Sequence, residues 1–360
     1  MIVPVTKPYL PKIEYYKEYI QEAFDREWLT NHGPLLVRLE NQLKDHLKVK
    51  RLISVSNGTI ALQLAYRALQ LQGEVITTPF SYVATTSSLL WEGLTPVFAD
   101  IDPVSWTILP QSIEALINKK TTAIVATHVF GIPCDVRAIE AIAKKYHLKV
   151  IYDAAHCFGV EYENQSILNW GDISTLSFHA TKIFHTVEGG GVICHDPALE
   201  NIISQLGNFG HTSPTEFSLP GINGKLSEVH AAMGLAILPD VGKLIDYRKS
   251  IHATYDELLV DLPIEKPQLP TGVTRYNYAY YPVLFPTSES TIRVFEALKE
   301  NGITSRRYFY PSLSKLEYLK HTNPTPIADN IASRVLCLPI FYELEKPTLE
   351  RICALIKANI

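Results

Sequence analysis

Residues 148–156 read Leu-Lys-Val-Ile-Tyr-Asp-Ala-Ala-His, a short apolar run that ends in Asp153. Such a run is typical of a buried strand in a parallel sheet, and polar side chains at the carboxyl end of such a strand face the ligand crevice of an α/β protein. Asp153 is therefore a candidate site residue. The alternative is that Asp153 only caps a following helix, which is common after an apolar strand.

A second run favours a chemical role for Asp153. Ser177-Phe-His-Ala-Thr-Lys182 follows another apolar segment and precedes Glu188-Gly-Gly-Gly191. A lysine that traps a carbonyl must be neutral, and burial or nearby cations lower its pKa enough for that. In enzymes that use pyridoxal phosphate, a lysine holds the cofactor aldehyde and an acid keeps the pyridine nitrogen protonated. We expect Lys182 and Asp153 to fill these two catalytic roles.

Short apolar runs alternate with helical patterns over the first two thirds of the chain, which predicts βα units and a largely parallel sheet. A helix over 227–238 leads to a smaller α/β unit, which holds a strand at 278–285 and a terminal helix from about Lys346. We therefore predict a large cofactor-binding domain over 1–240, including the N-terminal segment, and a small domain over 241–360. The predicted strands are 52–56, 74–78, 123–127, 149–152, 174–178 and 191–194, and the predicted helices between them include 60–69 and 136–147.

The composition is that of a globular protein without a nucleic-acid or membrane partner. Of the 360 residues, 46% are hydrophobic and 19% charged, and the net charge of −4 provides no basic field for a duplex. No long apolar stretch and no leader-like N-terminus are found, which favours a cytoplasmic protein. The five cysteines have no metal-site spacing, so we predict reduced core thiols and no metal; Cys157 beside His156 is a poor candidate for a catalytic thiol.

A phosphate site is predicted where Ser56-Asn-Gly-Thr59 joins a strand to a helix. Backbone N–H groups and the positive end of the helix dipole meet at Gly58 and Thr59, which is the arrangement that binds anions. The alternative is a plain turn in which Asn57 or Thr59 caps the helix. The glycine spacings of dinucleotide-binding and Walker-type sites are absent from the chain.

Two aromatic side chains follow the next predicted strand, in Thr78-Pro-Phe-Ser-Tyr82. Either Phe80 or Tyr82 could lie flat against a pyridine ring, although an aromatic residue in such a place is often part of the core.

Taken together, these motifs resemble the DegT/DnrJ/EryC1/StrS family of pyridoxal phosphate-dependent nucleotide-sugar aminotransferases. The resemblance covers nearly the whole chain and implies an aspartate aminotransferase-like fold, known as fold type I. Besides the motifs above, it rests on four further segments: one near the N-terminus, one in the middle of the chain and two near the C-terminus. These read Trp28-Leu-Thr-Asn-His-Gly-Pro34, Gly221-Ile-Asn-Gly-Lys-Leu-Ser-Glu228, Arg306-Arg-Tyr-Phe-Tyr-Pro311 and Ile331-Ala-Ser-Arg-Val-Leu-Cys-Leu-Pro339.

The resemblance implies a role for each matching residue. Lys182 would carry the cofactor and move the substrate proton, and Asp153 would pair with the pyridine nitrogen. His156 would lie beside the ring, with Tyr82 stacked on the other side. Asn223 would reach the phosphate bound by the partner subunit, which implies a homodimer with shared active sites. The residues expected to hold the cofactor are Gly58, Thr59, Tyr82, Asp153, His156, Ser177, Lys182 and Asn223.

The segment Gly221-Ile-Asn-Gly-Lys-Leu226 resembles enzymes that aminate C4 of the sugar more than those that aminate C3, although many relatives have Gly-Tyr-Asn-Tyr-Arg-Met there. The resemblance implies transfer from L-glutamate to dTDP-4-keto-6-deoxyglucose, for O-antigen or another surface polysaccharide. The alternatives are a 3-keto sugar, a GDP- or UDP-linked 4-keto sugar, a sugar dehydratase, and a cofactor-binding regulator. A dehydratase of this fold would have His in place of Lys182. The expected sugar contacts are Trp28, Thr30, His185 and Tyr310.

Overall fold

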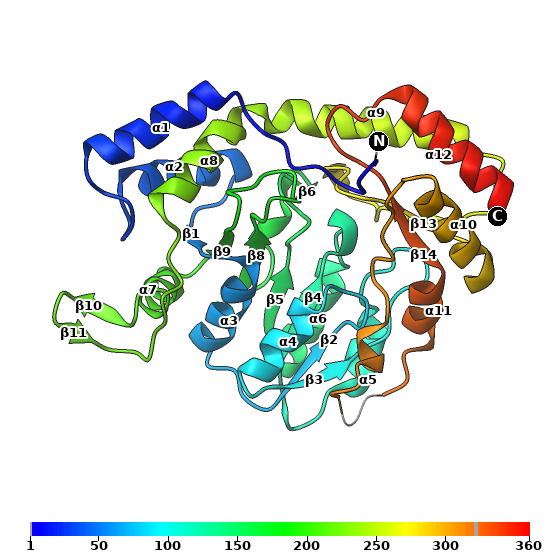
Figure 1. The fold of residues 1–360 in the computed structure, drawn as a ribbon. Coiled ribbons are helices and arrows are strands. Elements are labelled where there is room, and N and C mark those ends of the chain that lie inside the picture. The colour runs from blue at the N-terminus through cyan, green and yellow to red at the C-terminus, as the bar shows by residue number, and fades with distance from the viewer. Residues whose placement is uncertain (1, 320–322) are drawn as a thin grey trace.

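A seven-stranded sheet forms the centre of the protein in the computed structural model, which describes residues 2–319 and 323–360 (Figure 1). The strand order is β1-β9-β8-β5-β4-β2-β3, and only β9 runs against its neighbours. The carboxyl ends of the other strands therefore lie along one edge. The strands are β1 (Leu52–Val55), β2 (Glu74–Thr77), β3 (Thr95–Phe98), β4 (Thr121–Thr127), β5 (Lys149–Asp153), β8 (Ile173–Ser177) and β9 (Gly190–Cys194).

Helices cover both faces of this sheet because successive strand residues point to opposite sides. Val75 and Val125 pack with one layer of helices, whereas Ile76 and Ile124 pack with the other. The first layer consists of α3 (Gly58–Ala68), α4 (Ala84–Trp91) and α7 (Pro197–Leu206). The second consists mainly of α2 (Pro34–Leu47), α5 (Pro110–Leu116), α6 (Val136–Tyr146) and α8 (Glu228–Ile237), with α1 (Ile13–Asp25) against α8.

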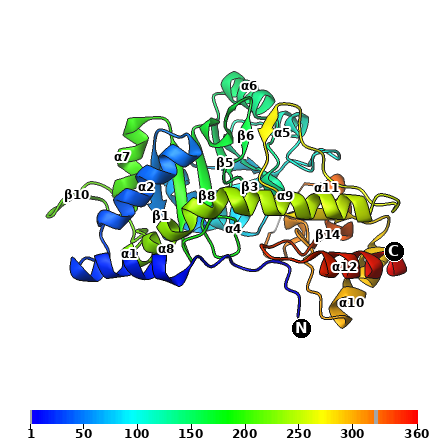
Figure 2. The ribbon, with the colours of Figure 1, turned by 90° about the horizontal axis from the view of Figure 1, so that it is seen from above.

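The smaller unit is built on an antiparallel pair, β13 (Tyr281–Leu284) and β14 (Val335–Leu338). The long helix α9 (Val241–Leu258) joins it to the sheet domain (Figure 2). Leu244 of α9 packs in the core of the large domain and Tyr255 in that of the small one, so α9 is shared between them. The other helices of the unit are α10 (Ser288–Glu300), α11 (Pro326–Arg334) and α12 (Lys346–Asn359).

The N-terminal segment contacts the small unit, although the predicted division assigned it to the large domain. The Val3 amide donates to the carbonyl of Gly302 at 2.8 Å, and the Ile340 amide donates to the carbonyl of Val5 at 2.9 Å. The predicted boundary near residue 240 coincides with the start of α9. It remains a prediction, because α9 contributes to both cores.

The predicted α/β class, all six predicted sheet strands and the predicted helices of the large domain are confirmed, with boundary differences of a few residues. The strand predicted over 278–285 is shorter, because Tyr278 has a φ of 54° and the chain turns there before β13 begins. The remaining strands are peripheral: β6 (Glu161–Tyr162) pairs with β7 (Gln165–Ser166) and β12 (Val273–Arg275), and β10 (His211–Ser213) forms a hairpin with β11 (Glu216–Phe217). Within the described residues, no helix is both long and apolar enough to cross a membrane.

Candidate active site

A cavity of about 440 Å³ opens at the carboxyl edge of the sheet, between the large domain and the loops of the small unit. It brings together seven of the residues predicted for the cofactor, which come from four separate segments of the chain. These are Gly58, Thr59, Tyr82, Asp153, His156, Ser177 and Lys182.

Lys182 lies in the turn that follows β8, and its side chain is enclosed by the cavity walls. Its Nζ donates a hydrogen bond of 3.3 Å to the hydroxyl of Tyr280. Burial lowers the pKa of Lys182 to about 8, while the negative charge of Asp153 opposes that shift. At pH 7 about a tenth of the molecules thus carry Lys182 as a neutral, nucleophilic amine, far more than for a lysine with the ordinary pKa.

Asp153 ends β5 and is 6% exposed. Its Oδ2 accepts a hydrogen bond of 2.7 Å from the Thr85 hydroxyl, and its Oδ1 accepts one of 3.2 Å from the Ala155 amide. Burial raises the pKa of Asp153, and these two hydrogen bonds and Lys182 partly offset the rise. No helix follows Asp153 directly, so the interpretation of this residue as a helix cap is wrong. A buried carboxyl with raised proton affinity is suited to sharing a proton with a ring nitrogen.

His156 is buried beside Asp153, with its ring orientation fixed. Its Nδ1 accepts a hydrogen bond of 3.1 Å from the amide of Phe130, which places the proton of the neutral ring on Nε2. Burial and then the charge of Lys182 lower the pKa of His156 well below its usual range. The ring therefore stays neutral, and it lines the cavity beside Asp153.

The start of α3 forms the predicted anion cradle. The Asn57 side chain caps the helix by accepting from the Ile60 amide at 2.9 Å, as the alternative interpretation anticipated, while Gly58 and Thr59 still line the cavity. A Cβ on Gly58 would come within 3.1 Å of the Ser177 Cβ, so the two segments are in close contact. First-turn N–H groups and two hydroxyls thus converge on one region, which suits a phosphate.

The structure distinguishes between Phe80 and Tyr82, the two candidates for stacking on a flat ring. Phe80 is fully buried, with its ring edge-on to those of Trp106 and Phe309, and it belongs to the core. Tyr82 is 55% exposed on the cavity wall and is free to stack on a flat ring.

The remaining predicted residues do not line this cavity. Asn223 is exposed and pairs through its backbone with Asn208, and Trp28 donates to the carbonyl of Thr30. Tyr310 is exposed beneath the guanidinium of Arg307. These positions are compatible with contacts to a second subunit, so their roles stay predictions.

His185 occupies the interior instead of the cavity wall. It is 1% exposed, its Nε2 lies 2.8 Å from the Tyr9 carbonyl, and its Nδ1 accepts from the Val187 amide at 3.2 Å. Both ring nitrogens are therefore engaged with backbone, which gives His185 a packing role in this chain and no access to a sugar in the cavity.

Four cavity residues come from the small unit and were not selected from the sequence: Tyr280, Arg306, Tyr308 and Phe309. The segment 306–311 contributed to the family resemblance, and aromatic side chains are dense at 276–281 and 308–310, but neither signal assigned these residues to a cavity. Local patterns do not reveal that these loops fold back over the edge of the sheet, since that depends on tertiary packing.

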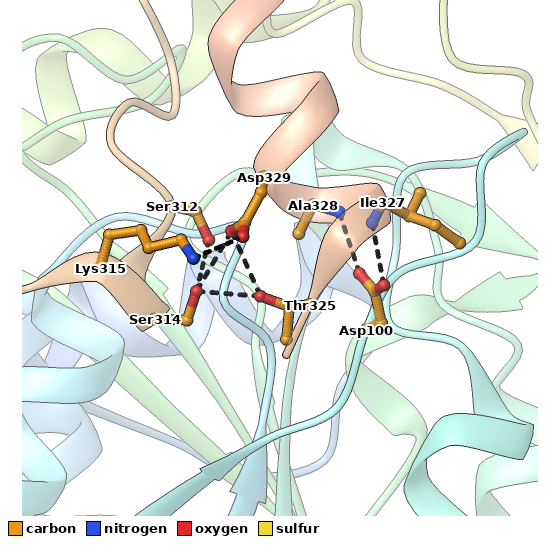
Figure 3. A network of polar contacts seen from close by, with 8 residues as sticks. All are labelled: Asp100, Ser312, Ser314, Lys315, Thr325, Ile327, Ala328 and Asp329. Carbon is orange, nitrogen blue, oxygen red and sulfur yellow. Dashed lines mark hydrogen bonds and ion pairs between the residues drawn. The ribbon is translucent and has the colours of Figure 1, made fainter. Parts of the chain in front are cut away.

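A polar network fastens these loops to the large domain (Figure 3). Asp100, just beyond β3, accepts from the amides of Ile327 and Ala328 at 3.0 and 2.9 Å and so neutralises the first turn of α11. Asp329 of α11 binds Lys315 at 2.9 Å, and the Leu313 amide donates to the Pro79 carbonyl at 2.8 Å. The network holds the segment that carries Arg306 to Phe309 over the cavity.

The titration of Lys182 leads to a prediction for the apoprotein. The rate of uptake of pyridoxal phosphate should rise with pH around a midpoint near the pKa of about 8, because only the neutral amine attacks the aldehyde. Asp153→Asn should move this midpoint to lower pH, since the carboxylate stabilises the ammonium form. Absorbance of the bound cofactor, followed over about four pH units, measures it. A midpoint near the ordinary value of 10.5 would contradict the burial of Lys182.

The fold and the cavity define a class of protein: an α/β protein in which a lysine of lowered pKa, a buried acid and the start of a helix line one cavity. The model of the DegT/DnrJ/EryC1/StrS aminotransferase family matches residues 12–357, and the chain belongs to that family and is an aminotransferase. The resemblance read from the motifs is thereby confirmed.

Two relatives and one solved structure show which proteins this chain is similar to. The chain is 42% identical to a dTDP-4-amino-4,6-dideoxy-D-glucose transaminase of Shigella dysenteriae, with 98% of both chains covered. It is 30% identical to a GDP-perosamine synthase of Vibrio cholerae, with 99% and 98% covered. Its fold matches the crystal structure of DesI in the presence of its TDP-sugar product with a TM-score of 0.95 at 33% identity, with 99% and 92% covered.

Proposed function

We propose that the protein is a pyridoxal phosphate-dependent transaminase that moves the amino group of L-glutamate to C4 of dTDP-4-keto-6-deoxyglucose. The observation that carries this proposal is the enclosure of Lys182 and Asp153 with the anion cradle in one cavity. The choice of sugar is supported by the full-length similarity to the Shigella transaminase and by the close fit to DesI, which was crystallised with a TDP-sugar. The enzyme would be cytoplasmic, and its amino-sugar product would be incorporated into a surface polysaccharide.

The residues present fit the cofactor. Gly58, Thr59 and Ser177 would hold its phosphate, Tyr82 and His156 would flank its ring, and Asp153 would keep its nitrogen protonated. When bound, pyridoxal phosphate supplies an electron sink for the carbon that loses a proton. Asp153 would maintain that sink, because its carboxyl, whose pKa burial raises, would share the proton of the ring nitrogen.

Lys182 is the group placed to move the proton. Its amine, whose pKa burial lowers to about 8, would accept the proton from the α-carbon of the amino donor and pass it to the cofactor. In the second half of the reaction the same amine would carry a proton back to C4 of the sugar. The hydroxyl of Tyr280, 3.3 Å from Nζ, limits where the released amine can swing.

We also propose that the protein is a homodimer in which Asn223 completes the phosphate site of the partner subunit. Asn223 is exposed and lies outside the cavity of its own chain, as such an arrangement requires. Mixing inactive Lys182→Ala with Asn223→Ala subunits should restore activity through mixed dimers that contain one intact site. No restoration after verified subunit exchange would remove this part of the proposal.

The sugar is tested by competition between nucleotide-linked 4-keto sugars. We expect kcat/KM for dTDP-4-keto-6-deoxyglucose to exceed that for GDP-4-keto-6-deoxymannose by at least about 100-fold, because a site built to pair with one nucleotide leaves polar groups unpaired with another. The GDP sugar is the relevant alternative, given the similarity to the perosamine synthase. Equal or reversed kcat/KM values would leave the assignment as a transaminase in place but would contradict the dTDP sugar as its substrate.

A further inference from the structure

We infer that Arg306 binds the α-carboxylate of the amino-acid donor, which makes it a substrate-binding residue for the first half of the reaction. This assignment rests on the proposed function. Arg306 lines the same cavity as Lys182, and among the described residues it is the one arginine that does so.

The guanidinium of Arg306 is held in place, and no counter-ion is found for it in the described part of the chain. Its Nη1 donates a hydrogen bond of 2.7 Å to the hydroxyl of Tyr308, and its Cζ lies 5.3 Å from the centroid of the Tyr308 ring. Among the described residues, no carboxylate lies within ion-pair distance of Arg306. A partly buried cation of this kind is suited to an anionic ligand, and the flat guanidinium matches a carboxylate in two hydrogen bonds.

The backbone at Arg306 is also fixed. Its amide donates to the Cys337 carbonyl at 3.1 Å, and the Cys337 amide donates back at 2.7 Å. Arg306 is thus attached to β14 of the small unit and its side chain extends toward the large domain. A carboxylate bound there would touch both halves of the protein.

The position of Arg306 relative to Lys182 favours a donor carboxylate over a diphosphate. The Tyr280 hydroxyl lies 3.3 Å from Lys182 Nζ, and the centroids of the Tyr280 and Tyr308 rings are 6.0 Å apart. The Tyr308 hydroxyl in turn accepts the hydrogen bond from Arg306. The charge of Arg306 is close enough to help lower the pKa of Lys182. In an amino acid the carboxylate is bonded directly to the carbon that reacts at Lys182. In a nucleotide 4-keto sugar the diphosphate lies across the ring from the reacting C4.

The two half-reactions separate these ligands. With the pyridoxal phosphate form of the enzyme and L-glutamate, Arg306→Ala should raise the glutamate concentration for half-maximal rate by about 100-fold, since a charge-assisted, two-point contact is lost. With the pyridoxamine phosphate form and dTDP-4-keto-6-deoxyglucose, the same variant should stay within about threefold of wild type. Stopped-flow absorbance of the cofactor follows both reactions.

Two further variants guard against a merely structural effect. Arg306→Lys keeps the charge without the planar fork and should lie between wild type and Arg306→Ala in the glutamate half-reaction only. Arg293→Ala is the control, because the Arg293 side chain lies on α10 of the small unit, donates to the Asn359 carbonyl and does not line the cavity. It should leave both half-reactions unchanged.

Unchanged glutamate dependence in Arg306→Ala and Arg306→Lys would overturn the assignment, as would a loss confined to the sugar half-reaction or equal losses in both. Those results leave the proposed function intact, because the wild-type enzyme still turns over. A wild-type holoenzyme inert toward both L-glutamate and the sugar would instead overturn the proposed function, and the assignment of Arg306 with it.

Discussion

Lys182→Ala should reduce turnover by at least about 10⁴-fold, because one substitution removes both the covalent attachment of the cofactor and the base that moves the substrate proton. The surroundings of the side chain support so large an effect. Its amine is enclosed, has a pKa lowered by burial to about 8, and faces Tyr280 and Asp153 in one cavity. Steady-state transfer from L-glutamate measures the loss, and a borohydride-reduced peptide identifies the attachment site.

The matched control is Lys144→Ala. Lys144 lies on α6, is largely exposed and pairs only with Glu140 one turn away, so its removal should change turnover by less than about twofold. Turnover in Lys182→Ala within tenfold of wild type would show that another group carries the cofactor and the proton.

Asp153→Ala should retain part of the cofactor yet lower turnover on the order of 10³-fold or more, because the ring nitrogen loses the acid that keeps it protonated. Retention is expected since the cradle at Gly58, Thr59 and Ser177 is untouched. Cofactor content by absorbance and the rate of the glutamate half-reaction measure the two effects separately.

Asp153→Asn distinguishes chemistry from packing. The amide oxygen can still accept from the Ala155 amide, and the NH2 group can donate to the Thr85 hydroxyl, which can accept as well as donate, so the fold should be preserved. It cannot keep a ring nitrogen protonated, and its turnover should therefore be nearly as low as that of the alanine variant. Near-normal turnover in Asp153→Asn would refute the role of the carboxylate.

The chemistry at the edge of the sheet could be predicted from the sequence because it follows strand ends. Asp153 closes a strand, while Gly58 and Thr59 start a helix immediately after one, and both patterns are local. Parallel strands present such ends at one edge, so residues far apart in the chain converge without further information. Lys182 was recognisable because its setting is poorly suited to a solvated charge.

The small-unit contribution could not be predicted in the same way. Arg306 and Tyr308 reach the cavity because the loop between α10 and α11 is fastened to the large domain by contacts such as that of Leu313 with Pro79. Those contacts are tertiary and leave no periodic signal. The prediction for His185 was wrong for the same reason: the family resemblance implied a sugar contact, but the chain turns the side chain toward the carbonyl of Tyr9.

The run Glu188-Gly-Gly-Gly191 also has a different meaning in the structure. A Cβ on Gly190 would come within 2.6 Å of the Asn57 backbone, so glycine is needed for β9 to pass under the start of α3. The glycines therefore position the phosphate cradle by allowing close packing, and Gly190 and Gly191 belong to a strand.

The most direct test is the absorption spectrum of the purified protein with pyridoxal phosphate, recorded before and after adding L-glutamate and, separately, dTDP-4-amino-4,6-dideoxyglucose. Conversion of the bound pyridoxal band to the pyridoxamine band with both amines is the predicted result, since each is an amino donor in one direction of the proposed reaction. Conversion with glutamate alone would discard this sugar. The absence of any bound band would contradict the assignment of Lys182 and with it the proposed function.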